Sequence, residues 1–113
     1  MEKYSSGIDG TFDALSDPTR RAIVELLVQK PHRASELAVA TGTSRSRMSK
    51  HLRILLDAGL ARDERLPDDA RARVFYMRPE GISDVREWLA RLQKEWDAQL
   101  RSFKEHVEKK GDA

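Results

Sequence analysis

Apolar residues recur every three or four positions along most of the chain, which is the spacing of one face of an α-helix. The pattern first predicts a short helix through Phe12 and Leu15. A sharper helix start follows at Asp17-Pro18-Thr19, because aspartate caps exposed backbone amides and proline suits a first helical position that needs no donor. Lys30-Pro31 ends this second helix, since a residue before proline is disfavoured in the helical conformation.

Two further helices are predicted on either side of a short turn. The first covers Ser35 to Ala40, and Gly42 just beyond it can take the left-handed conformation of a helix terminus. Ser44 caps the second, which stops at Gly59 and has inward positions at Met48, Leu52, Leu55 and Leu56. Two helices joined by so short a turn are typical of a helix-turn-helix unit.

Between Leu60 and Arg78 the three-to-four-residue spacing of apolar positions gives way to shorter apolar segments. Turn residues Pro67-Asp68-Asp69 separate Leu66 from an apolar run that ends at Met77, which predicts a β-hairpin. A long helix follows Pro79 and Gly81. We therefore expect a mainly α fold with a small β-hairpin, namely a winged helix-turn-helix of about five helices and a two-stranded wing.

Composition narrows the class of protein. Hydrophobic residues make up 39% of the chain and charged residues 35%, with few glycines and prolines, which suits a soluble and mostly helical protein. No apolar run reaches the roughly 18 residues that a membrane helix needs, and the N-terminus lacks the layout of a secretory signal, so we expect a cytoplasmic protein without a membrane partner. The absence of cysteine excludes disulfides, thiolate metal sites and cysteine nucleophiles.

The net charge of +2 is too small to identify a partner, so the distribution of charge matters more. In the helix capped by Ser44, the outward positions carry four cations and no acid. A helix fits the major groove of DNA, where its N-terminal turn contacts the bases. We predict base contacts from Arg45, Ser46, Arg47 and Ser49, and further DNA contacts from Thr43, Ser44, Lys50, His51 and Arg53. The alternative is a solvated basic face.

The wing arginines and His51 each leave more than one interpretation open. Arg71 and Arg73 lie just after the hairpin tip and are candidates for contacts with phosphates or the minor groove, while the acidic tip itself should stay in solvent. His51 fits a boundary position with its ring hydrogen-bonded and also a DNA-facing setting; the two are compatible, and we favour contact with DNA.

Across Phe12 to Tyr76 the chain resembles the ArsR/SmtB family of bacterial repressors. The matching segments are FDALSDPTRRAIVELL, SELAVATGTSRSRMSKHLRILLDAGLA and RARVFYM. The strongest is SKHLRILLDAGL, which places Ser49, His51, Leu52, Leu55, Ala58, Gly59 and Leu60 where the family keeps its recognition-helix pattern. The resemblance implies a dimeric winged helix that represses transcription by occupying an operator, usually near its own gene.

The family's usual metal sites are missing from this sequence. Many relatives bind metal through a Glu-Leu-Cys-Val-Cys motif, where this chain has Glu36-Leu37-Ala38-Val39-Ala40, and alanine has no donor atom. At the other family site Asp84 is followed by Val85 and Arg86, so the first expected histidine is absent. We expect no metal and no cofactor, and the chain is most similar to the cysteine-free branch, whose inducer is often unknown.

The last helix predicts a homodimer, because its apolar stripe is too long for one small core to cover. The first helix must cover part of the stripe, and a partner helix is the natural cover for the rest. The predicted interface comprises Phe12, Leu15, Val85, Trp88, Leu89, Leu92, Trp96, Leu100 and Phe103. We expect both tryptophans to serve packing rather than a ligand pocket.

Together these features predict one domain over residues 1–113, with a flexible lead at 1–9, a DNA-binding core at 17–78 and a dimerisation helix at 80–110. The predicted function is a dimeric DNA-binding regulator, an (auto)repressor that recognises an inverted-repeat operator. The alternative is a winged-helix module that holds an acidic protein. Ser35, Ser44 and the histidines form no nucleophile-base set, so we expect no catalytic residues.

Overall fold

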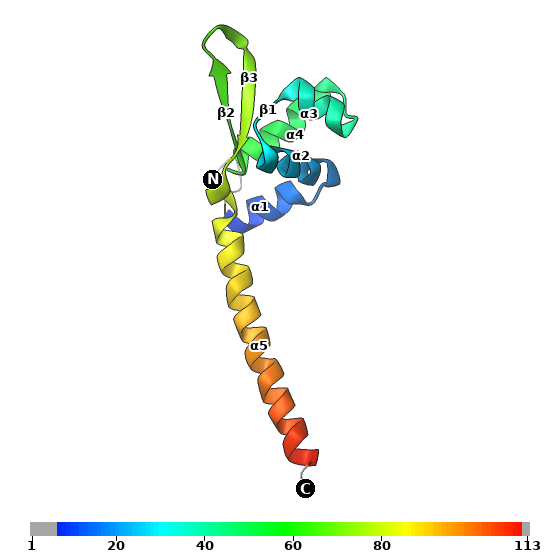
Figure 1. Cartoon of the computed structure of the whole chain (residues 1–113), viewed down its shortest axis with the longest axis vertical. Helices are drawn as coiled ribbons and strands as arrows, with labels where there is room; N and C mark the ends of the chain where they lie inside the picture. Colours follow the sequence, from blue (N-terminus) through cyan, green and yellow to red (C-terminus); the bar gives the residue numbers. More distant parts are fainter. Residues whose placement is uncertain (1–6, 112–113) are drawn as a thin grey trace. The chain divides into compact units, whose positions relative to one another are not determined.

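The computed structural model describes residues 7–111, apart from the side chains of residues 70 and 71 (Figure 1). The elements follow in the order α1 (Gly7–Leu15), α2 (Pro18–Gln29), β1 (His32–Arg33), α3 (Ala34–Thr41), α4 (Arg45–Asp57), β2 (Ala61–Leu66), β3 (Asp69–Met77), the 3-10 helix η1 (Pro79–Ile82) and α5 (Ser83–Gly111). Residues up to Ser83 form one compact unit, and those from Asp84 onward form a second.

The predicted fold class, a mainly α winged helix-turn-helix, is confirmed. The sheet has three strands instead of two, because the short strand β1 pairs antiparallel with β3 on the side away from β2. His32 lies opposite Phe75 in this added ladder, and Ala61 lies opposite Met77 in the β2–β3 ladder. The wing is therefore the hairpin of β2 and β3, with its turn at Pro67-Asp68.

Local capping sets the helix starts where the sequence predicts them. Asp17 accepts a hydrogen bond of 3.0 Å from the backbone N–H of Arg20, with Pro18 in the first turn of α2. Ser44 Oγ accepts from the backbone N–H of Arg47 at 3.2 Å and caps α4. Gly42 ends α3 with a φ of 66°, a left-handed conformation that favours glycine. These residues fix the start of α2, the end of α3 and the start of α4.

The start of the chain differs from the prediction in one respect. α1 begins at Gly7, so the last three residues of the range 1–9 that was expected to be a flexible lead are helical. The rest of that range lies outside the described residues.

Thr11 of α1 is buried, and its hydroxyl lies 2.9 Å from the carbonyl of Gly7 and 3.4 Å from that of Gly81. α1 thus packs against the segment that follows the sheet.

One apolar core holds the first unit together. It takes side chains from α1, α2, α3, α4, the sheet and the residue just before β2: Ala14, Ile23, Leu27, Leu37, Ala38, Met48, Leu52, Leu55, Leu60, Ala61 and Phe75. Met48, Leu52 and Leu55 come from the predicted inward face of α4, while Leu56 is only partly buried. Anchoring three positions of α4 in this way fixes which of its faces is left to solvent.

α5 is a single helix of 29 residues in which no residue is buried. Its large apolar residues lie three or four positions apart, and the spacing repeats after eleven residues, from Val85 to Trp96 to Val107. They form one stripe along the helix. No helix in the described part of the chain combines the length and the apolar character that crossing a membrane requires.

Candidate nucleic-acid interface

The outward face of α4 is a basic surface without acids. Its residues are all exposed: Arg45, Ser46, Arg47, Ser49, Lys50 and Arg53. Within residues 7–111, none of the four cations forms an ion pair with an acid. Met48 and Leu52 hold the opposite face in the core, with exposed fractions of 1% and 3%. The structure therefore places the predicted basic residues in solvent, where they are available to a ligand.

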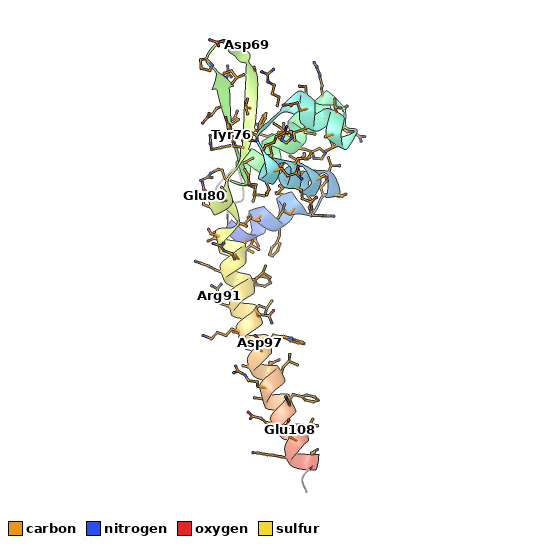
Figure 2. All side chains as sticks on the ribbon, viewed as in Figure 1. Asp69, Tyr76, Glu80, Arg91, Asp97 and Glu108 are labelled. Carbon is orange, nitrogen blue, oxygen red and sulfur yellow. The ribbon has the colours of Figure 1, made fainter. Side chains whose placement is uncertain are left out.

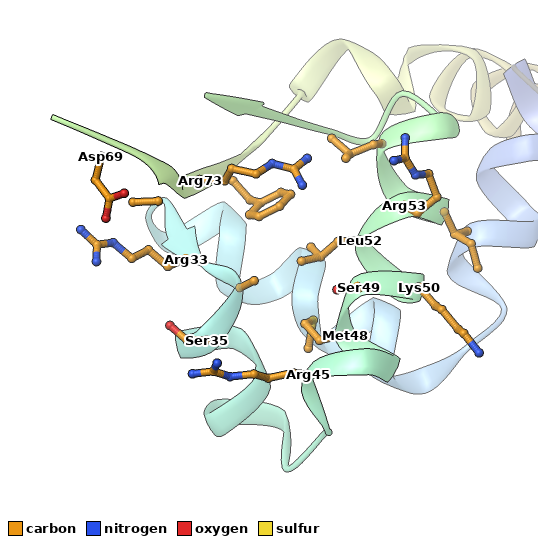
Figure 3. Close-up of a pocket in the computed structure, with 15 residues that line it drawn as sticks. Arg33, Ser35, Arg45, Met48, Ser49, Lys50, Leu52, Arg53, Asp69 and Arg73 are labelled. Atoms are coloured by element: carbon orange, nitrogen blue, oxygen red, sulfur yellow. The ribbon is translucent and has the colours of Figure 1, made fainter. Parts of the chain in front are cut away.

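A groove of about 960 Å³ runs between α3, α4 and the wing (Figure 3). Its base includes the buried side chains of Met48, Leu52 and Phe75. The charged residues that line it are five cations and one acid: Arg33, Arg45, Lys50, Arg53, Arg73 and Asp69. A concave surface with an excess of one charge concentrates the electrostatic field, so this groove attracts anions.

Thr43 and Ser44 organise the turn that leads into α4. Thr43 is half-buried, with its hydroxyl oxygen 3.0 Å from that of Thr41. Ser44 is exposed, but its hydroxyl is engaged as the N-cap. Both residues lie beside the basic face and are already hydrogen-bonded within the protein, and their contact with DNA stays a prediction. These hydrogen bonds hold the turn that precedes α4 and the N-cap of the helix.

His51 occupies the predicted boundary position with its ring hydrogen-bonded, and its contact with DNA stays a prediction. Its side chain is 17% exposed, and ring Nδ1 lies 3.2 Å from a guanidinium nitrogen of Arg20 and 4.0 Å from a carboxylate oxygen of Asp17. A guanidinium only donates hydrogen bonds, so Nδ1 accepts from Arg20. The ring thus fills a boundary position between α4 and α2.

Asp17 belongs to the same cluster. The backbone N–H of Arg20 that bonds to its carboxylate lowers the pKa of Asp17, desolvation opposes this, and the nearby positive charge of Arg20 lowers the pKa further. The N-cap of α2 is therefore held in its charged form, close to the helix dipole that favours an anion there.

The structure gives one of the two predicted wing arginines a partner within the protein. Arg73 donates two hydrogen bonds to Asp63 on β2, one of them from Nε at 2.7 Å, and its guanidinium lies 5.2 Å from the ring centre of Phe75. The charge of Arg73 is thus balanced within the hairpin. The side chain of Arg71 lies outside the described residues. Asp68 is exposed in the turn, as expected, and Asp69 lines the groove.

Two basic residues near the interface were not predicted from the sequence. Arg33, the N-cap residue of α3, lines the groove. Arg65 lies on β2 directly opposite Arg73. The signal for Arg65 was available in the alternation of side chains along the hairpin, because residues two apart share a face. The position of Arg33 depends on its pairing with β3, which no local pattern indicates.

The predicted interface residues on α5 are exposed or half-buried. Trp88, Trp96 and Phe103 have exposed fractions of 37%, 57% and 66%, and the remaining exposed positions are Leu89, Leu92 and Leu100. Val85 is half-buried. In the first unit Phe12 is 45% exposed, whereas Leu15 is partly buried against the core. Within the described residues no cluster of three histidine or carboxylate side chains is suited to hold a metal ion.

Comparison with known proteins defines the family. Residues 17–63 match the model described as bacterial regulatory protein, arsR family. The chain is 37% identical over 112 residues to the HTH-type transcriptional regulator Rv2034 of Mycobacterium tuberculosis, covering 99% of this chain and 98% of the relative. The chain belongs to the arsR family. The resemblance predicted from the sequence is thereby confirmed.

Solved structures of arsR-family proteins share the fold. An ArsR-like transcriptional regulator from Rhodococcus sp. RHA1 is similar with a TM-score of 0.76 and 30% identity, over 89% of this chain and 90% of that one. The ArsR family transcriptional regulator RHA00566 is similar with a TM-score of 0.72 and 34% identity, over 80% and 96%. The arsR family and these relatives are transcriptional regulators rather than enzymes.

Proposed function

We propose that this arsR-family chain is a sequence-specific DNA-binding regulator that inserts α4 into the major groove. The observation that carries the proposal is the exposed, acid-free face of α4 beside a cationic groove. Arg45, Ser46, Arg47 and Ser49 lie in the first turns of the helix, which is the part that reaches base edges in helix-turn-helix proteins. Lys50 and Arg53 lie further along and contact phosphates. Residues 17–78 form this DNA-binding core.

The regulator acts as a homodimer. Trp96 and Phe103 are more than half exposed on α5, and Leu92 and Leu100 beside them on the stripe have exposed fractions of 46% and 48%. A contiguous apolar stripe of this length is costly in water and marks an interface. A second copy of residues 80–110 covers it by two-fold symmetry, because each copy offers the same stripe to the other. Phe12 adds to this interface.

The dimer binds an inverted repeat and represses transcription. Two symmetry-related recognition helices favour half-sites about one helical turn apart. The names of the relatives support a regulatory role, and the family resemblance favours repression at an operator near the regulator's own gene. The regulator works in the cytoplasm, where its operator lies.

The first test selects duplexes from a random-sequence library with the wild-type protein. The selected duplex is then used in anisotropy titrations of the double variant Arg45→Ala/Arg47→Ala. We expect binding to be lost, while thermal unfolding stays unchanged because both side chains are exposed. Lys94→Ala/Arg101→Ala is the matched control, since it removes the same charge from exposed positions on α5.

Retained affinity in the arginine variant would refute the role of α4. The alternative function, a module that holds an acidic protein, is supported instead if the wild-type protein enriches no DNA sequence and captures a protein partner. In that case the same two arginines should still be needed for capture.

A further inference from the structure

The two strands of the wing bring two arginines face to face. Arg65 on β2 lies directly opposite Arg73 on β3. Side chains at directly opposed positions share one face of a hairpin, and like charges placed there destabilise it. The face in question is the one toward the groove, because Arg73 and Phe75 both line the groove (Figure 3). An anion placed between the strands and α4 would relieve this repulsion.

The two arginines differ in how their charges are balanced. Arg73 is hydrogen-bonded to the carboxylate of Asp63, as described above. Arg65 is exposed and forms no ion pair with any acid in the part of the chain that the structure describes. The cluster of Asp63, Arg65 and Arg73 thus keeps one uncompensated positive charge, and it belongs to Arg65.

The opposite face of the same strand provides a contrast. Arg62 lies 2.5 Å from a carboxylate oxygen of Glu64, and its guanidinium stacks 4.2 Å from the ring centre of Tyr76. Arg62 and Arg65 lie on opposite faces of the hairpin, because residues three apart on a strand point to opposite faces. The exposed cation on the outer face is therefore paired, while the one on the groove face is not.

We propose that Arg65 is the wing residue that binds a DNA backbone phosphate, and that Asp63 weakens DNA binding by holding Arg73. The inference rests on the proposed function, because its ligand is the phosphate backbone of the duplex that α4 reads. Phosphate contacts add affinity without reading sequence. Asp63 thereby sets how many wing cations are available to the duplex.

The test compares Arg65→Ala with Arg62→Ala, which remove the same charge from opposite faces of β2. Binding to the selected duplex is measured by anisotropy from about 50 to 200 mM salt. Arg65→Ala should weaken binding about three- to tenfold and lower the slope of log affinity against log salt by about one per bound subunit. Arg62→Ala should leave both nearly unchanged. Equal effects of the two variants would overturn the role of Arg65.

A second pair of variants tests the restraint on Arg73. Asp63→Asn should strengthen binding and steepen the salt slope, because it releases Arg73 to the duplex. Glu64→Gln removes the same charge from the outer face and should change the affinity less. An Asp63→Asn variant that binds no more tightly than Glu64→Gln would overturn the restraint. Failure of the wild type to bind any duplex would instead refute the proposed function.

Discussion

Arg20 and His51 join α2 to α4 through a hydrogen bond of 3.2 Å between a guanidinium nitrogen and ring Nδ1. The same guanidinium donates from Nε to the carbonyl of Ala14 at 2.6 Å and reaches the carbonyl of Asp13 at 3.3 Å. One side chain therefore donates hydrogen bonds to two carbonyl groups near the end of α1 and to a ring nitrogen on α4. An arginine on α2 therefore links carbonyls of α1 to a side chain on α4.

Replacement of Arg20 by lysine tests this link. Lysine keeps the charge but lacks the planar fork that reaches three acceptors, so we expect a loss of about 1–2 kcal/mol in the free energy of unfolding. Urea denaturation followed by circular dichroism measures it. Arg21→Lys is the matched control, because Arg21 is exposed and makes one such bond, to the carbonyl of Leu15. Equal losses in both variants would contradict the prediction.

The lowered pKa of Asp17 predicts an acid-dependent part of the stability. A carboxyl group whose pKa is lower in the folded state stabilises the fold at pH values above its unfolded pKa of about 3.9, and this contribution disappears as pH falls through the folded value. Asp17→Asn keeps a capping side chain but does not titrate.

Thermal unfolding of the wild type and of Asp17→Asn should therefore differ most near neutral pH. The gap between their unfolding midpoints should shrink as the pH is lowered below about 4. A gap that stays constant down to pH values near 2 would show that the charge of Asp17 contributes nothing and that capping alone matters.

Gly81 is predicted to be intolerant of any side chain. A Cβ atom at this position would lie 2.3 Å from the carbonyl oxygen of Gly59 and 3.1 Å from Leu60 Cα, and these are backbone atoms that cannot rotate away. Gly81→Ala should cost about 1–3 kcal/mol or more in the free energy of unfolding. Gly111→Ala should be neutral in the same denaturation experiment, because nothing lies within 4 Å of its Cβ position.

A charge on the α5 stripe should break the proposed dimer. Leu92→Glu places a carboxylate at a stripe position that is 46% exposed in the described chain and would be covered by the partner. Sedimentation velocity should show monomers and anisotropy should show weakened DNA binding. Lys94→Glu is the control, because two residues of a helix turn by about 200° and place Lys94 away from the stripe. A dimeric Leu92→Glu variant would contradict the proposed interface.

The sequence predicts α4 and its exposed face well because the signals are local. Ser44 caps the helix, and Met48, Leu52 and Leu55 mark its buried side within a few residues of one another. The strand β1 could not be predicted in this way, since two residues carry no periodicity. His32 and Arg33 are a strand only because β3, more than 40 residues later, lies beside them.

The same distinction explains why the sequence did not indicate the partners of His51 and Arg73. His51 is held by a residue 31 positions earlier, and Arg73 by one 10 positions earlier. Spacing along one helix or strand identifies an outward cation, but it does not show which acid or ring from another element lies next to it. The basic character of the site was thus predictable, whereas the pairing of its individual charges required the three-dimensional structure.

The repeat of Val85, Trp96 and Val107 on α5 has a consequence for how two copies of this helix can lie together. A seven-residue repeat winds paired helices into a left-handed supercoil. An eleven-residue repeat has about 3.67 residues per turn and gives only a slight right-handed supercoil. In the proposed dimer, two such helices would run nearly straight beside each other. Removing or adding a block of eleven residues would shorten or lengthen the contact without rotating its ends out of register.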